Sequence, residues 1–172
     1  MAFITNKKEQ ERIKIRNFND FYRDAMNKGI SIVPFDIFEY VNSFDDIELN
    51  INDKDLNYST IGLVEKFENG YGFLISINKF HNIKIQRMIL ARLFAHLVLH
   101  RDYIIQNGKI EIKNFWTSDI MYKEANEFAS KLLMPKATFE VKCHEFRTFG
   151  ELAEYFNITA KMAKFRFENL WN

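Results

Sequence analysis

Cysteine, proline and glycine are all scarce in this 172-residue sequence. Cys143 is the only cysteine, so no disulfide can form within the chain and a cysteine-rich zinc knuckle is excluded. The 6 Gly and 2 Pro residues form no linker, repeat or low-complexity tract. We therefore expect one domain over residues 1–172, which is long enough to bury a substantial core.

Long apolar runs and an excess of one charge are also missing. Arg92 and His96 interrupt the most apolar stretch before it reaches the length that spans a bilayer. The first residues lack the apolar core of a signal peptide, so a cytoplasmic protein without a membrane segment is the expectation. The formal net charge of +1 provides no overall basic field for nucleic acid.

The hydrophobic pattern in the first half of the chain changes from helical spacing to the alternation that is typical of strands. Helical spacing predicts a helix over 7–28 that ends at Gly29, and a shorter helix after Pro34 with Asp36 as its cap. Three segments then have strand character, and the turn-rich "ENGYG" joins the last two into a hairpin. They are "DIELNI", "TIGLVEKF" and "FLISIN", which predict a small antiparallel sheet.

The second half is predicted to be helical. Residues 82–100 are apolar nearly all the way round, which indicates a buried central helix, and a loop is expected at 101–117. The next helix begins at a Ser118/Asp119 cap and ends near Pro135. Two short helices, about 148–156 and 159–170, complete a mostly helical α+β fold.

The central helix carries part of a zinc-peptidase motif. A helical H-E-x-x-H places two imidazoles one turn apart to bind zinc, and its glutamate acts as general base on the zinc-bound water. In this chain the corresponding window, residues 92–96, reads R-L-F-A-H. Only the second imidazole remains.

Two longer stretches resemble the ImmA/IrrE family of metallopeptidase-like proteins. "RMILARLFAHLVLH" is similar to the family's R-F-T-L-A-H-E-L-G-H-L-L-L-H, and "KEANEFASKLLMP" to its E-A-N-x-F-A-A-x-L-L-M-P. The resemblance covers about residues 30–170, preceded by the N-terminal helix of residues 1–29. It implies a small antiparallel sheet packed on a thermolysin-like (zincin-like) helical core, with a C-terminal helix-turn-helix-like pair.

The resemblance also assigns roles to individual residues. His96 matches the second zinc-binding histidine and Glu124 the third ligand, while His100 matches a histidine usually outside the metal's first shell. Arg92 stands in place of the first histidine, and Leu93 in place of the catalytic glutamate. Neither can do that chemistry, because a guanidinium stays protonated and a leucine takes no proton from water.

We therefore expect no catalytic residues, no bound cofactor and no metal, with zinc as the alternative. The residual ligand candidates are His96 and Glu124, and less strongly His100. An unpaired buried guanidinium is costly, so we hypothesise that Arg92 forms an ion pair with Glu124, flanked by His96.

The resemblance implies a regulatory protein of a phage or mobile element that binds a partner such as a helix-turn-helix repressor. One alternative is a metal-dependent peptidase with a rearranged site, using His100, Asp102 or Glu111 as ligands. Another is DNA binding through the last helices. Lys161, Lys164 and Arg166 would contact phosphates, but most of that helix pair is core-like, so direct binding to nucleic acid is not favoured.

Overall fold

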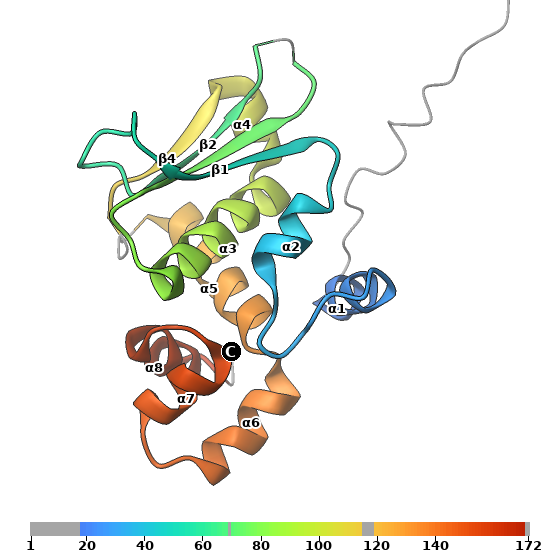
Figure 1. The fold of residues 1–172 in the computed structure, drawn as a ribbon, viewed down its shortest axis with the longest axis vertical. Helices are drawn as coiled ribbons and strands as arrows, with labels where there is room; N and C mark the ends of the chain where they lie inside the picture. The colour runs from blue at the N-terminus through green and yellow to red at the C-terminus, as the bar shows by residue number, and fades with distance from the viewer. Residues whose placement is uncertain (1–17, 69, 115–118, 171–172) are drawn as a thin grey trace, which may run out of the picture.

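The computed structural model describes residues 18–68, 70–114 and 119–170. In these ranges the chain forms helices packed on a small sheet, which confirms the α+β prediction (Figure 1). The sheet has the strand order β1-β3-β2-β4. Its strands are β1 (Ile47–Asp53), β2 (Gly62–Lys66), β3 (Phe73–Asn78) and β4 (Lys109–Ile112).

The sheet is mixed rather than wholly antiparallel, which corrects that part of the prediction. The hairpin of β2 and β3 is antiparallel as expected, and β4 adds antiparallel to β2. The hairpin places β3 between β1 and β2, however, so β1 pairs with β3 in parallel. Parallel pairing depends on contacts between distant segments, which alternation of apolar residues does not report.

The central helix is α3 (Ile83–Leu99), and it is buried along most of its length as predicted. Figure 1 shows the sheet lying across one side of α3. The helix α5 (Ile120–Leu133) packs against α3, and the shorter helices α1 (Phe18–Asn27) and α2 (Ile37–Asn42) pack around them. None of the helices in the described ranges combines the length and the apolarity that crossing a bilayer requires.

Several predicted helix ends are confirmed. Gly29 follows α1 with a positive φ of 74°, which is a typical helix stop. Asp36 and Asp119 accept hydrogen bonds at the first turns of α2 and α5. Ser118 and the first part of the predicted helix 7–28 lie outside the described residues.

Two segments contain structure that the sequence pattern does not predict. The expected loop at 101–117 contains the helix α4 (Arg101–Asn107) and the strand β4. After Pro135 the chain continues into α6 (Lys136–Glu145), because proline is well suited to precede a first helical turn. Both α4 and β4 are short, and their stability comes from packing on the sheet rather than from local periodicity.

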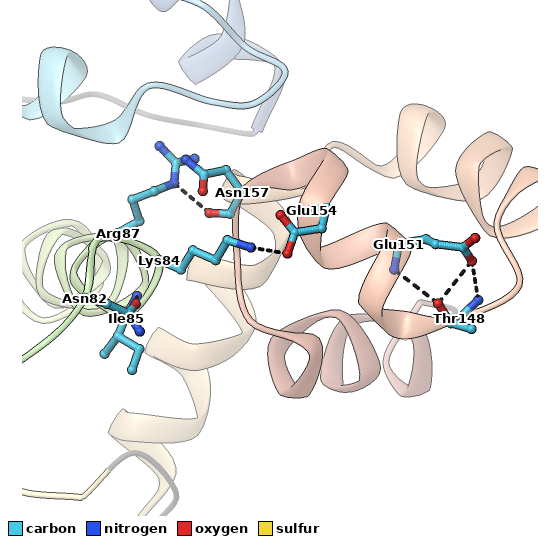
Figure 2. A network of polar contacts seen from close by, with 8 residues as sticks. All are labelled: Asn82, Lys84, Ile85, Arg87, Thr148, Glu151, Glu154 and Asn157. Carbon is cyan, nitrogen blue, oxygen red and sulfur yellow. Dashed lines mark hydrogen bonds and ion pairs between the residues drawn. The ribbon is translucent and has the colours of Figure 1, made fainter.

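The predicted helix-turn-helix-like pair is α7 (Phe149–Phe156) and α8 (Ala160–Glu168). Thr148 and Glu151 form a capping box at the start of α7, drawn in Figure 2. Asn157 ends α7 in a left-handed conformation with φ 52°, which turns the chain into α8.

Arg87 joins this helix pair to the central helix. It is buried on α3, and its Nε donates to the carbonyl oxygen of Asn157 at 2.9 Å (Figure 2). Its Nη2 donates to the carbonyl oxygen of Phe35 at 2.8 Å. A neighbouring ion pair between Lys84 and Glu154 lies at the surface.

We predict that Arg87→Met lowers the free energy of unfolding by about 2–4 kcal/mol, because two carbonyl groups lose a charged donor in a buried place. Lys84→Met removes the exposed pair and is the matched control, with an expected loss below about 1 kcal/mol. Urea unfolding of both variants measures the difference. Equal losses would contradict this role for Arg87.

Candidate functional site

The site is built from one face of α3. Arg92 and His96 lie one turn apart on α3, and His100, four residues after His96, is the residue that caps the end of this helix. The facing helix α5 contributes Tyr122 and Glu124. The site therefore depends on the packing of α3 against α5.

His96, His100 and Glu124 form a chain of hydrogen bonds from the core to the surface. His96 Nδ1 lies 3.0 Å from His100 Nδ1, and His100 Nε2 lies 3.0 Å from Glu124 Oε2. His96 is 0% exposed, whereas the side chain of Glu124 is 56% exposed. The chain connects a buried imidazole to a solvent-accessible carboxylate.

One assignment of protons satisfies both contacts when the two rings are neutral. His100 Nε2–H donates to the Glu124 carboxylate, so His100 Nδ1 accepts from His96 Nδ1–H. His96 Nε2 then carries a lone pair, and this buried atom makes no hydrogen bond within the described residues. It is the atom that would face a metal if one were bound.

The surroundings of His96 keep it neutral. Burial is the largest cause, and together with the positive charge that His100 carries when protonated and the charge of Arg92 it lowers the pKa of His96 to about 3. The Tyr122 ring packs edge-on against the imidazole, with centroids 5.1 Å apart. The Tyr122 hydroxyl donates to the carbonyl oxygen of Glu111 at 2.8 Å, which fixes the ring.

Arg92 is 1% exposed, and the predicted ion pair with Glu124 is wrong. Its Nη2 donates to the carbonyl oxygen of Asn114 at 3.5 Å. Burial lowers the pKa of Arg92 to about 10, with Tyr122 opposing the shift, so the guanidinium stays charged at neutral pH. Glu124 bonds to His100, which lies about 12 Å farther along the helix axis than Arg92.

Leu93, in place of the catalytic glutamate, belongs to the core between α3 and the sheet. It is fully buried and packs against the backbone of β2 at Gly62. A Cβ at Gly62 would lie 3.0 Å from Leu93 Cδ1 and 2.7 Å from Ile89 Cγ2, so only glycine fits there. Leu93 therefore occupies a closely packed position away from solvent.

The residues proposed for a rearranged metal site do not come together. Asp102 is exposed on α4, and Glu111 accepts a hydrogen bond from Thr60 and pairs with Lys113 at 3.5 Å. The two ring nitrogens of His100 contact different residues, His96 and Glu124. The three side chains therefore form a chain and do not converge on a common metal position. Across the described ranges, no three His, Cys, Asp or Glu side chains are placed to hold a metal ion.

The last helix has few cations available for DNA. Arg166 is buried, and its Nε donates to the carbonyl oxygen of Met134 at 3.4 Å. Lys161 and Lys164 are exposed, and Lys164 lies 3.7 Å from Glu168. The arrangement gives no support to DNA binding by α8.

Tyr122 is not among the predicted site residues, and His100 is predicted only as a weaker ligand candidate than His96 and Glu124. His100 has a detectable signal, because it repeats the spacing of Arg92 and His96 on the same face. Tyr122 lies three residues before Ala125 and seven before Ala129, both on the buried stripe of α5, which places it at the interface with α3. Its contact with His96 depends on how the two helices pack.

The fold, with a small sheet packed on a buried central helix, is the α+β fold that the resemblance predicts. The family model described as the IrrE N-terminal-like domain matches residues 48–168, which is more than half of the chain. The chain therefore belongs to the IrrE N-terminal-like family. This confirms the predicted resemblance.

The comparison with solved structures shows a similarity of fold alone. A Mycobacterium tuberculosis transcriptional regulator is similar in structure, with a TM-score of 0.64 and 16% sequence identity. The similarity covers 90% of this chain and 47% of that one, so this chain spans about half the length of that protein. No curated protein matches the sequence.

We predict that Leu93→Glu lowers the free energy of unfolding by about 3–5 kcal/mol, because it places a carboxylate in the dry core beside β2. Leu93→Met keeps the volume and the polarity and should cost less than about 1.5 kcal/mol. Denaturant unfolding compares the two. A Leu93→Glu variant as stable as Leu93→Met would mean that this position is open to water.

His96 also predicts a pH dependence of stability. The unfolded chain protonates this histidine near pH 6.5, but the folded chain does so only near pH 3. The contribution of neutral His96 to the free energy of unfolding is therefore complete above pH 6.5 and is lost as the pH falls toward 3. In this range the free energy of unfolding changes by up to about 1.4 kcal/mol per pH unit because of this one group. Urea unfolding between pH 7 and 4 should show a smaller slope for His96→Leu than for the wild type. Parallel curves would contradict a buried neutral His96.

Proposed function

We propose that this chain is a non-catalytic regulatory binding protein of a phage or other mobile element. It acts on a repressor or similar protein by binding it, without cleaving it. The observation that carries this proposal is the burial of Arg92 and Leu93 at the positions of the first zinc ligand and the general base.

Two physical effects argue against zinc hydrolysis at this site. The Arg92 cation stands where the first ligand should be and repels a divalent cation instead of donating a lone pair to it. Leu93 cannot accept a proton from water, and loss of a general base alone removes a rate contribution of about 10²–10⁴-fold. The remaining candidates, His96 and Glu124, are joined through His100.

Family membership and structural similarity support the regulatory part of the proposal. The chain belongs to the IrrE N-terminal-like family, and a protein that shares its fold is described as a transcriptional regulator. A scaffold that has lost its metal chemistry can still hold a former substrate, because binding and catalysis depend on different groups. Such a protein would oppose a repressor by sequestering it.

The direct test uses a helix-turn-helix repressor encoded beside the gene for this chain. Purified chain and repressor are mixed with added zinc or with EDTA, and then analysed by size-exclusion chromatography and denaturing gel. We expect an intact repressor, a complex that EDTA does not weaken, and reduced occupancy of the operator DNA. The variant His96→Leu, with folding checked by circular dichroism, should bind equally well.

Cleavage of the repressor that EDTA and His96→Leu both abolish would overturn the non-catalytic reading. Failure of the repressor to bind under any condition would overturn the proposed partner.

A further inference from the structure

The surface end of the histidine chain opens into a shallow hollow between α1, α3 and α5. Besides His100, it is lined by Phe18, Leu99, Glu124, Glu127, Phe128 and Lys131. It is open to solvent, which suits a side chain presented by another macromolecule better than an enclosed small molecule.

The floor of this hollow is aromatic. The rings of Phe18 and Phe128 lie with centroids 4.9 Å apart at an angle of 46°. Phe128 is further held by an edge contact with the buried Phe21, with centroids 5.2 Å apart. The floor is therefore an apolar surface of rings that pack against one another.

The rim has two carboxylates with different partners. Glu127 is paired with Lys131 on the next turn of α5. Glu124 is bound through Oε2 by the His100 imidazole, and its Oε1 makes no hydrogen bond or ion pair within the described part of the chain. Among the residues that the structure describes, Glu124 is thus the rim carboxylate without a lysine or arginine partner.

We propose that this hollow binds an arginine side chain that projects from an apolar segment of a partner protein. The methylene stem would lie over Leu99 and the two phenylalanine rings, and the guanidinium would pair with Glu124. Guanidinium groups stack on aromatic faces and bond to carboxylates in this way. The inference rests on the proposed function and deepens it, because it names the chemistry of the partner at the mouth of the former metal site.

The test follows backbone amide signals of the full chain by NMR at pH 7 during titration with N-acetyl-L-arginine methylamide. N-acetyl-L-citrulline methylamide, which has nearly the same shape without the charge, is the matched control ligand. We expect millimolar binding of the arginine probe, with shifts centred on Glu124 and Phe128, and much weaker effects from citrulline.

Two variants make the result specific. Glu124→Gln should weaken binding of the arginine probe by about threefold, as expected for loss of one partly exposed ion pair. Glu48→Gln changes the net charge equally, but Glu48 is an exposed residue of β1 outside the hollow, so this variant should leave binding unchanged. Equal shifts from arginine and citrulline, or equal affinity in Glu124→Gln and wild type, would overturn the inference.

These outcomes are separate from those of the proposed function. A repressor complex that forms while the arginine probe fails would overturn only the role of the hollow. Cleavage of a repressor would overturn the proposed function even if the probe binds.

Discussion

Burial of the helix α3 is the constraint on which the rest of this structure depends. The sheet packs on one side of it and α5 on the other, and Arg87 ties the C-terminal helices to its first half. Residues on α3 must therefore be apolar or have partners for their buried polar groups. Leu93 does so by packing against Gly62, whereas Arg92 remains charged beside Tyr122 and the carbonyl group of Asn114. The residues at both of these motif positions are therefore part of the packed core around α3.

Much of the fold follows from local signals in the sequence. The continuous apolar pattern of 82–100 and the caps and stops of the later helices mark α3, α5, α7 and α8 close to their observed bounds. The parallel pairing of β1 with β3 and the four-residue strand β4 do not follow, since both depend on partners far away in the chain. Periodicity measures which residues are buried, but it does not say which strands become neighbours.

The contacts within the candidate site were not predictable from the sequence. The family motif predicts Arg92, His96 and Glu124 as site residues, but the predicted pairing of Arg92 with Glu124 is wrong, since Glu124 bonds to His100. His100 lies eight positions after Arg92, about two helical turns along the axis, so a carboxylate on the facing helix can reach only one of the two residues. Glu124 meets the level of His100. Which residues meet depends on the relative axial position of the two packed helices, and a local sequence pattern does not determine that position.

In the function proposed above, α3 keeps the position of the family's metal-binding helix without binding zinc. His96, His100 and Glu124 form a hydrogen-bonded path from the core to the open hollow. The most direct test of this account is equilibrium dialysis of the purified chain against zinc, followed by elemental analysis. The account predicts far less than one zinc per chain, with the same content in the wild type and in His96→Leu. One zinc per wild-type chain that is lost in His96→Leu would contradict it.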